Sequence, residues 1–595
     1  IAVHVALERQ LAKEGTNRHK LGREEFLKRA WAWREKYGNV ILEQLKKLGL
    51  SLDWTRLKFT MDPDYQEAVK VAFHHYHEKG WIYQGTRVIN WCPRCATTIS
   101  DLEVNYVAEK GKLYFIKYGP FTLATTRPET KLGDTALAVH PSDVRYKNYI
   151  GKELEIESVD NHIPADQPAR AKKIKIKVVD DQAVDKEFGT GIVKVTPAHD
   201  ITDSEIGQRH DLESVQIIDE QGRMNKNAGV RYEGLKTTEA REKIVADLQA
   251  LGLIEKIDDY EHNVARCDRC NSVIEPLPSK QWFLKMSELA KLALEPLKEG
   301  KLKIHPERWA GPYQDWLENI RDWCISRQLW WGHKIPIEGE EDVLDTWFSS
   351  ALWPLATLGW PNEKSKDFQE YYPTDFITSD RGILFLWQVR MVFSGMEFTG
   401  QSPFKDMLIH ATVLTKDGKR MSKSLGTGVN PIDLMEKYGV DALRFALASQ
   451  STGLQDLRFG EDLLIMGKKF ANKIWNIARF TIGKVGENYQ WKNSRPENEW
   501  TQKMDETAKF VTEQIEKYNF AEATNHLYHF IWHEIADKFL EESKEKNDPE
   551  NSDTLAYLLV NSLKLLHPFM PFLTEEIYSK LPIKDKKLLL VEDWP

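Results

Sequence analysis

The chain has 595 residues, a length that predicts three or four domains rather than one. Its 82 basic and 90 acidic residues give a net charge of −8, which excludes a protein that coats nucleic acid by bulk positive charge but allows local recognition of a folded RNA. Five cysteines exclude a disulfide scaffold, and the sequence has neither a signal-peptide pattern nor a membrane-length apolar run, so we expect a reducing, cytoplasmic setting without a membrane span.

Two helices are predicted near the amino end. Residues 21–48 place apolar side chains three or four positions apart on one face, and Gly49 follows where a helix commonly ends. That face consists of Phe26, Ala30, Trp33, Tyr37, Ile41, Leu45 and Leu48. A second helix is predicted from about Tyr65 to Lys79. The first methionine is Met61, so we expect residues to be missing before Ile1.

A block rich in predicted strands follows. Residues 113–116 and 122–124 flank Gly119-Pro120 as a hairpin would, residues 173–178 alternate apolar and charged side chains as a half-buried strand does, and residues 191–195 form another strand. We interpret residues 105–266 as an inserted β-rich domain.

Two C-x-x-C motifs mark the ends of this block. Cys92 and Cys95 precede it, and Cys267 and Cys270 follow it. This spacing suits tetrahedral zinc, and the long separation is sensible if the pairs meet at the root of an insertion. One shared structural Zn²⁺ is one interpretation, and two reduced or vestigial pairs are the other.

Mixed helix and strand are predicted to about residue 460, and residues 461–595 are nearly all helical in pattern. Two apolar faces predict a helix bundle. Their members are Phe520, Ala523, Leu527, Phe530, Ile531 and Ile535 on one face, and Leu559, Val560, Leu563, Leu566 and Phe569 on the other.

Two sets of polar residues predict chemistry. Arg420, Ser422, Lys423 and Ser424 lie in a glycine-flanked loop whose ammonium and hydroxyl groups suit a polyphosphate, although a solvated or phosphorylated surface loop is an alternative. In the β-rich block, residues 194–203 offer a lysine, hydroxyls and two carboxylates. These could hold an ammonium and a hydroxylated side chain while water attacks an ester, whereas the plain alternative is a strand end with ordinary turn residues.

The loop at Met421–Gly426 resembles the KMSKS loop of class I aminoacyl-tRNA synthetases, and Asn430-Pro431 and Tyr438-Gly439 continue that family's pattern. The resemblance implies that Lys423 stabilises the phosphates of ATP during adenylation, with Arg420 in place of the motif's first lysine. It also implies ATP and Mg²⁺ as requirements of the reaction.

Residues 316–328 resemble the valine, isoleucine and leucine branch of that family, and residues 342–354 are most similar to the valyl members. This resemblance implies that Trp347, Trp387 and Ile383 line the amino-acid pocket. Gly382 stands where the family usually has an acidic residue that binds the substrate's ammonium group, and Asp380 is a candidate substitute. Because residues 379–382 look slightly isoleucyl-like, an isoleucyl enzyme is the alternative.

The β-rich block resembles the editing domain of the same branch. The resemblance implies that an editing pocket is formed by Arg127, Phe188, Lys194, Thr196, Asp200 and Asp203, and that Asp203 or Asp200 binds the aminoacyl ammonium or the threonyl hydroxyl. Such a second site is needed because a hydrophobic pocket rejects an isostere with an added hydroxyl only weakly.

Together these features predict a multidomain α/β protein in which a class I Rossmann-type catalytic domain is interrupted by the editing insertion. The expected domains are catalytic at 1–104 and 267–460, editing at 105–266, and α-helical anticodon-binding at 461–595. Expected partners are tRNA(Val), valine and ATP, and we expect a monomer. The family's H-x-G-H motif is expected upstream of Ile1, so this chain alone should activate valine poorly. An editing-only deacylase and a non-catalytic tRNA-binding relative are the alternatives from other classes.

Overall fold

The computed structural model describes residues 2–419, 421, 427–453, 456–486, 489–491 and 495–595. The predicted phosphate-loop residues Arg420, Ser422, Lys423 and Ser424 lie outside these ranges, so their roles stay predictions. The chain forms two compact units. The first contains residues 1–32, 60–290 and 320–363, and the second contains residues 33–59, 291–319 and 364–595.

The helices of the first unit are mostly short. They are α1 (Ala2–Lys13), α2 (Arg18–Leu21), α4 (Pro63–Glu78), α5 (Ile201–Arg209), α6 (Thr237–Ala250), α9 (Thr346–Ser350) and α10 (Trp353–Ala356). Helices α3 (Arg23–Lys47) and α7 (Ser287–Lys298) contain residues of both units.

Helix α3 confirms the predicted helix, although most of its apolar face is not buried. It ends as expected, because Gly49 has a φ of 74° and its N–H donates to the Lys46 carbonyl over 3.0 Å. Only Phe26 and Ala30 of the helix are buried, whereas Tyr37 is 45% and Ile41 57% exposed. Helical periodicity shows which side chains share a face and not whether anything covers it.

A four-stranded antiparallel sheet holds the main body of the first unit together. Its order is β12 (Trp323–Cys324), β10 (Glu275–Leu284), β1 (Ile82–Cys92) and β2 (Thr97–Thr98). Strands β13 (Ser326–Arg327) and β14 (Val343–Leu344) form a separate antiparallel pair.

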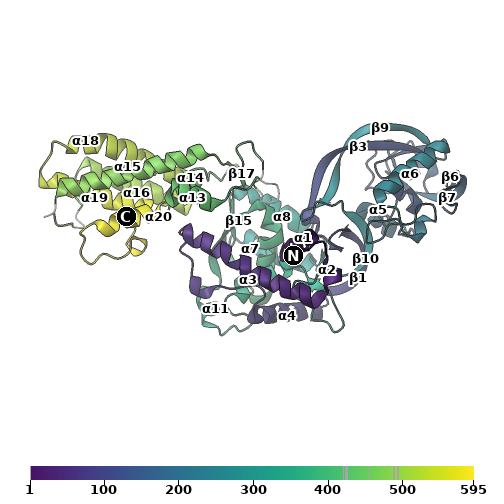
Figure 1. The fold of residues 1–595 in the computed structure, drawn as a ribbon, viewed down its shortest axis with the longest axis horizontal. Helices are drawn as coiled ribbons and strands as arrows, with labels where there is room; N and C mark the ends of the chain where they lie inside the picture. Colours follow the sequence, from purple (N-terminus) through teal and green to yellow (C-terminus); the bar gives the residue numbers. More distant parts are fainter. Residues whose placement is uncertain (1, 420, 422–426, 454–455, 487–488, 492–494) are drawn as a thin grey trace. The chain divides into compact units, whose positions relative to one another are not determined.

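The predicted insertion leaves and rejoins this body through one long ribbon (Figure 1). Strand β3 (Val104–Tyr118) pairs antiparallel with β9 (Ile254–Cys267), and the predicted boundary residues Asn105 and Arg266 are register partners. The predicted hairpin is confirmed, since β3 turns at Gly119-Pro120 into β4 (Phe121–Thr125). The ribbon leads to a second sheet of order β6 (Glu153–Val159), β7 (Ala171–Asp180), β5 (Ala136–Val139) and β8 (Ile192–Val195).

The apolar positions of these strands form the core of the block. In β7 the side chains of Ile176 and Val178 are buried while Lys175 and Lys177 are exposed, which confirms the predicted alternation. They pack in one cluster with Ile116, Leu137 and Ile244. A second cluster, which includes Ala136, Val195 and Ile206, packs helix α5 against the sheet, and the candidate pocket lies there.

The second unit contains a three-stranded parallel sheet of order β11 (Lys303–His305), β16 (Phe404–His410) and β15 (Thr374–Asp380). The chain passes from β15 to β16 through α12 (Val389–Thr399), the βαβ connection of Rossmann-type folds. Strands β17 (Val413–Leu414) and β18 (Leu457–Arg458) pair in parallel, and the helices here are α8 (Ala310–Glu318), α11 (Lys366–Tyr371), α13 (Pro431–Tyr438) and α14 (Val440–Ser449).

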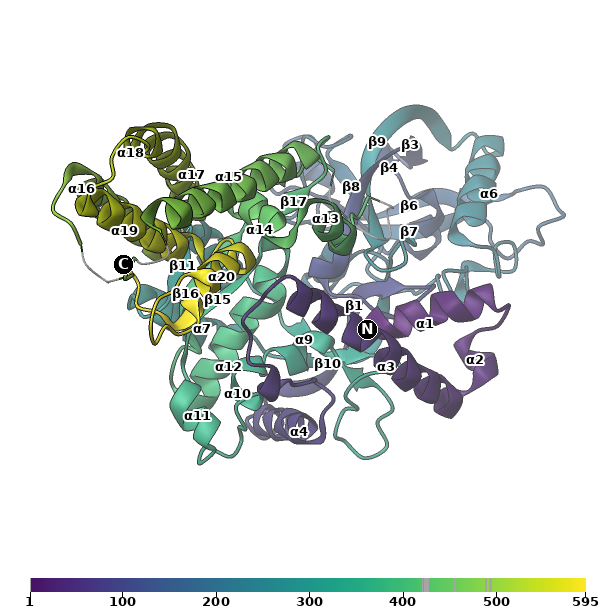
Figure 2. The same cartoon turned by 60° about the vertical axis from the view of Figure 1, so that its left-hand side comes forward.

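The predicted carboxyl-terminal bundle is present (Figure 2). It consists of α15 (Glu461–Val485), α16 (Glu499–Glu516), α17 (Phe520–His529), a π-helical stretch Phe530–Phe539, α18 (Leu540–Ser543), α19 (Pro549–Leu566) and α20 (Pro571–Lys580). Gly467 of α15 is needed for close helix packing, because a Cβ there would lie 2.8 Å from the Ala442 carbonyl oxygen of α14. Both predicted apolar faces contribute to one core, through Leu527 and Ile531 and through Leu559 and Leu563.

Among the described residues, no helix combines the length and the apolar character needed to cross a membrane.

Candidate functional site

A polar pocket of about 340 Å³ opens in the inserted block beside strand β8 and helix α5. Its walls come from four stretches of the chain: the end of β4 and the turn after it, residues 183–185, the end of β8, and the first turns of α5. The lining side chains that matter for chemistry are Thr125, Thr126, Arg127, Thr130, Asp185, Lys194, Thr196, His199, Asp200, Thr202 and Asp203.

Two carboxylates stand at the amino end of α5. Asp200 is the N-cap, and its Oδ1 accepts from the Asp203 N–H over 3.0 Å. Asp203 Oδ2 in turn accepts from the backbone N–H of Thr196 over 2.8 Å. Burial, reinforced by the negative charge of Asp200, raises the pKa of Asp203 to about 7. Asp203 therefore changes charge near neutral pH, inside the pocket.

A chain of hydrogen bonds fixes the lysine of the pocket. Lys194 Nζ donates to Thr130 Oγ1 over 2.7 Å and to Thr196 Oγ1 over 2.6 Å, and it lies 3.3 Å from Asp134 Oδ1. Thr196 Oγ1 donates to Asp134 Oδ1 over 2.6 Å, and the Tyr118 hydroxyl donates to the other carboxylate oxygen over 2.5 Å. Asp134 is fully buried and holds this array from behind.

Arg127 lies in a buried cluster of opposite charges. Its guanidinium contacts Glu275 and Glu129, and it donates to the His199 carbonyl over 3.1 Å. Arg241 makes two 2.8 Å hydrogen bonds to Glu129. Burial opposes ionisation of Glu129, but the two arginines outweigh it and lower its pKa, whereas burial raises the pKa of Glu275. Arg127 thus supports the pocket floor through its protein partners.

His199 is a structural residue of the wall. Its Nε2 accepts from the Ile217 N–H over 2.9 Å, and its Nδ1 lies 3.2 Å from the Pro276 carbonyl oxygen. Nδ1 must therefore carry the proton, so the ring is a neutral tautomer. Burial lowers the pKa of His199 to about 3, and both ring nitrogens are already engaged, so it is not available as a base.

The structure brings together Arg127, Lys194, Thr196, Asp200 and Asp203 of the predicted editing residues. Phe188 does not belong to the lining: it is 40% exposed and packs edge-on against Tyr260 at 6.5 Å. Sequence reasoning missed Asp134, because it lies in a loop without periodic pattern and only folding places it behind Lys194.

Trp347, predicted to line the amino-acid pocket, is the second residue of helix α9 in the first unit. The Asp345 carboxylate caps this helix and accepts the Trp347 backbone N–H over 3.2 Å. The indole Nε1 lies 3.4 Å from Glu103 Oε1. Both the backbone and the ring of Trp347 are therefore fixed by carboxylates.

The other residues predicted to bind the amino acid belong to the second unit. They lie at or shortly after the carboxyl end of β15, where α/β sheets commonly bind ligands. Ile383 and Trp387 are partly exposed there, Trp387 within a π-helical turn, Leu384–Gln388. Asp380 Oδ1 accepts the Gly382 N–H over 2.7 Å, and its Oδ2 accepts the Thr412 hydroxyl. Asp380 therefore already shapes this turn, and ammonium binding would add to that role.

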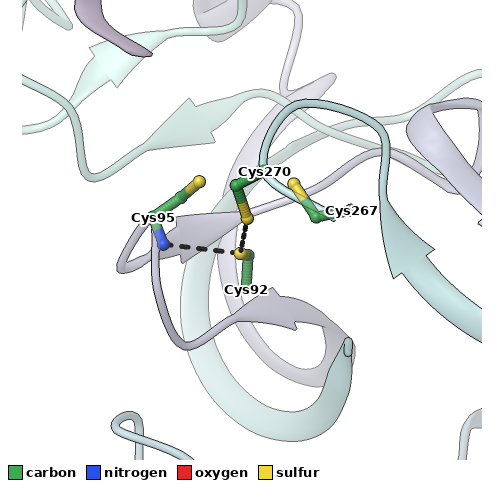
Figure 3. Close-up of side chains that lie close together, drawn as sticks. All are labelled: Cys92, Cys95, Cys267 and Cys270. Atoms are coloured by element: carbon green, nitrogen blue, oxygen red, sulfur yellow. Dashed lines mark hydrogen bonds between the residues drawn. The ribbon is translucent and has the colours of Figure 1, made fainter. Parts of the chain in front are cut away.

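Four cysteines meet at the root of the inserted block (Figure 3). The Sγ atoms of Cys92, Cys95, Cys267 and Cys270 all lie within 4.8 Å of one another, and none is in a disulfide. Thiolates at about 2.3 Å from a tetrahedral zinc would be about 3.8 Å apart, which this spacing fits.

The two C-x-x-C turns are built alike. In each turn the first cysteine is the last residue of a strand. The N–H of the residue after the second cysteine donates back to the carbonyl of the first cysteine over 2.8 Å, from Ala96 to Cys92 and from Asn271 to Cys267. Both of these residues have positive φ, 49° at Ala96 and 61° at Asn271. This paired geometry directs four soft ligands to one point, which favours zinc over two unrelated thiol pairs.

Comparisons with known proteins agree with this architecture. The family described as tRNA synthetases class I (I, L, M and V) matches residues 1–338 and 336–460, and the anticodon-binding domain of tRNA ligase matches residues 498–595. The chain is 45% identical over 639 aligned residues to the valine–tRNA ligase of Carboxydothermus hydrogenoformans, spanning all of this chain and 71% of that protein. The valine–tRNA ligase of Clostridium tetani is 44% identical over 642 residues, with the same coverage.

A solved structure of Mycobacterium tuberculosis methionyl-tRNA synthetase in complex with methionyl-adenylate has the same fold, with a TM-score of 0.60 at 14% identity. The similarity covers 99% of this chain and 86% of that one.

Proposed function

The chain belongs to the valine–tRNA ligases, in the class I tRNA synthetase family, and on that premise we propose that its inserted block, residues 105–266, hydrolyses threonine wrongly attached to tRNA(Val). The observation that carries this proposal is the pocket itself, in which Asp203, Lys194 and Thr196 converge beside helix α5. The predicted valine specificity agrees with the names of these relatives, and the isoleucyl alternative finds no support in them.

The pocket suits a small hydroxylated aminoacyl group. The Asp203 carboxylate provides a negative charge for the aminoacyl ammonium, and Thr196 and Lys194 offer polar atoms for a hydroxyl. A valyl group has a methyl where threonine has its hydroxyl, so it cannot form the hydrogen bonds with these polar atoms that a threonyl hydroxyl can form. That difference in hydrogen bonding lets the pocket favour threonine over valine.

In the proposed reaction, water attacks the carbonyl carbon of the aminoacyl ester, and the bond from that carbon to the ribose oxygen breaks. Free threonine and uncharged tRNA leave, and the proton lost by water balances the ribose hydroxyl that forms. The protein's contribution is to bind and orient the ester, because His199 is engaged through both ring nitrogens and Arg127 through its carboxylate partners.

The direct test is deacylation of threonyl-tRNA(Val), with valyl-tRNA(Val) as the second substrate and Asp203→Ala as the variant. We expect rapid hydrolysis of the threonyl ester alone and a loss of about 100-fold or more in the variant. The matched control is Asp166→Ala, which removes an exposed carboxylate of the same block that lies outside the pocket lining. Equal hydrolysis of both esters, or an unaffected Asp203→Ala variant, would refute the editing assignment.

For valine activation we propose that Lys423, with Arg420, Ser422 and Ser424, binds the phosphates of ATP, and that Trp347, Trp387 and Ile383 line the valine pocket. Support comes from the resemblance of the loop to the family motif and from the place of Trp387 after the carboxyl end of β15. Lys423→Ala should lower valine-dependent pyrophosphate exchange by about 100-fold or more. Lys419→Ala is the control, since Lys419 lies in the same segment and pairs with Asp417.

We also propose that the four-cysteine cluster binds one structural Zn²⁺. The zinc ion would fix the two C-x-x-C turns at the root of the block and would not contact the substrate. Metal analysis should give one zinc per chain, and Cys267→Ser should lose it. Among the described residues no other group of three or more His, Cys, Asp or Glu side chains could hold a metal ion, so the Mg²⁺ of the reaction has no assigned ligands.

The helical region from residue 461 onward is proposed to bind the anticodon part of tRNA(Val), which agrees with the family match at residues 498–595. A monomeric state and a cytoplasmic location stay predictions. Sedimentation of the purified protein with and without tRNA(Val) would test the first of them.

A further inference from the structure

Trp347 is held through its backbone by a buried ion pair. Asp345, whose carboxylate accepts the Trp347 N–H, is 0% exposed and lies 2.5 Å from the Nη2 atom of Arg327, which is also 0% exposed. Trp323 Nε1 donates to the same carboxylate over 3.0 Å. These contacts fix where helix α9 starts, but they leave the rotation of the Trp347 indole unspecified.

The indole itself is directed by Glu103. Its Nε1–H donates to Glu103 Oε1 over 3.4 Å, across 244 residues of sequence. Glu103 is buried, and its other oxygen accepts the Ser100 N–H over 3.3 Å. A buried carboxylate needs a positive partner, and this partner is Arg269, whose Nη2 donates to the same Oε1 atom.

Arg269 belongs to the second C-x-x-C turn, between Cys267 and Cys270. The turn also contacts Glu103 through its backbone, because the Asp268 N–H donates to the Glu103 carbonyl over 3.2 Å. Arg269 Nη1 is buried and has no hydrogen-bond partner within the described ranges, so the guanidinium depends on Glu103 and on the adjacent Asp268. The position of Glu103 is therefore tied to the conformation of the cysteine turn.

We propose that Glu103 is a positioning residue that sets the Trp347 indole through Arg269, so that the four-cysteine cluster controls the wall of the valine pocket. The inference rests on the proposed role of Trp347 in binding valine. When the four sulfur atoms are held together, the turn, Arg269 and Glu103 have one arrangement and the indole has one orientation. When the cluster is released, the turn loosens, and the indole loses its acceptor.

Two variants of the pair separate positioning from folding. Glu103→Gln keeps the shape but removes the charge that holds Arg269, and the double variant Glu103→Met with Arg269→Met replaces both partners by apolar groups of similar volume, which is tolerated better than an unpaired charge. The matched control is Asp247→Asn, because Asp247 is 7% exposed like Glu103 and forms a comparable buried pair with Arg231 away from Trp347.

We expect both Glu103 variants to raise the KM for valine about fivefold or more while kcat changes little, and the Asp247→Asn control to leave the KM unchanged. In a Trp347→Phe background, which lacks the indole N–H, Glu103→Gln should have no further effect on the KM. An unchanged valine KM in both Glu103 variants, or full additivity with Trp347→Phe, overturns the proposal.

A second readout does not depend on activity. In protein labelled with 5-fluorotryptophan, the ¹⁹F resonance absent from Trp347→Phe identifies Trp347. Chelation of the metal should shift this resonance, added Zn²⁺ should restore it, and the double Met variant should not respond. Protein isolated without zinc, or a resonance that stays in place when zinc is removed, shows that the cluster does not control Trp347.

Failure of the proposed function would look different. If Trp347 does not line the valine pocket, Trp347→Phe itself leaves the valine KM unchanged while its resonance still responds to the metal.

Discussion

The Lys194 ammonium donates to the Thr196 hydroxyl over 2.6 Å, and that hydroxyl donates onward to Asp134 over 2.6 Å. Thr196 therefore adds a second link between a lysine at the pocket surface and the buried carboxylate that the lysine also contacts directly over 3.3 Å. Such an array keeps polar groups in place before substrate arrives, so little reorganisation is needed on binding.

Replacing Thr196 by valine should disrupt this array. The side chain keeps its volume, but Lys194 and Asp134 each lose a hydrogen-bond partner, which should lower the free energy of unfolding by about 1–3 kcal/mol. Deacylation of threonyl-tRNA(Val) should fall about tenfold, as measured in single-turnover assays. Thr202→Val, another lining threonine outside the Lys194 array, is the control and should retain stability.

Hydrolysis by the inserted block should depend on the charge of Asp203. Its pKa of about 7 means that the carboxylate is mostly protonated at pH 6 and mostly ionised at pH 8. Because only the ionised form can bind an ammonium group by charge, the deacylation rate should rise with pH and level off above about 8. A rate that is flat between pH 6 and 8 would assign ammonium binding to another residue.

The same group should make stability depend on pH. In the unfolded chain an aspartate has a pKa of about 3.9, so between about pH 4 and 7 the folded protein holds a proton that the unfolded chain lacks. The contribution of Asp203 to the free energy of unfolding is therefore fully present below pH 4 and is lost as the pH rises through 7. Asp203→Asn should remove this slope, which urea unfolding at pH 5 and pH 8 would reveal.

Asp200 should act in two separable ways. As the N-cap of α5 it stabilises the helix, so Asp200→Ala should cost about 1 kcal/mol, whereas Asp200→Ser should cost much less. Its charge also raises the pKa of Asp203, so both variants should shift the midpoint of the deacylation pH profile downward. If only the alanine variant shifts the midpoint, the shift arises from the cap and not from the charge.

Arg127 should matter chiefly for the fold of the pocket floor. Arg127→Met leaves Glu275 buried without its charged partner, so the free energy of unfolding should fall by about 3 kcal/mol. Adding Glu275→Gln should restore part of this loss, because the second change removes the unpaired charge. A loss of activity with normal stability would instead indicate that Arg127 contacts the tRNA directly.

The sequence was most informative where function depends on neighbouring residues. Lys194, Thr196, Asp200 and Asp203 were predicted together because they lie within one strand end and one helix cap, and the fold keeps them adjacent. The Gly119-Pro120 hairpin was predictable for the same reason, since its turn chemistry is local.

The remainder depends on contacts that no local pattern encodes. Asp134 reaches Lys194 only because β5 and β8 pair, and Glu103 reaches Trp347 only because the chain returns from the inserted block. The exposure of Tyr37 and Ile41 in α3 has the same cause, since the periodicity of a helix does not encode what covers its apolar face.

The ribbon that joins the inserted block to its host has one further consequence. The chain enters the block at Val104 and leaves it at Cys267, and these two residues are partners in the β3–β9 register. Because its two ends lie one strand spacing apart, roughly 5 Å, the block can be inserted into or removed from a protein by joining the chain at two neighbouring positions. A turn of about two residues in place of residues 105–266 would reconnect the rest of the chain. The excised block would keep its two terminal strands paired with each other, which favours its independent folding.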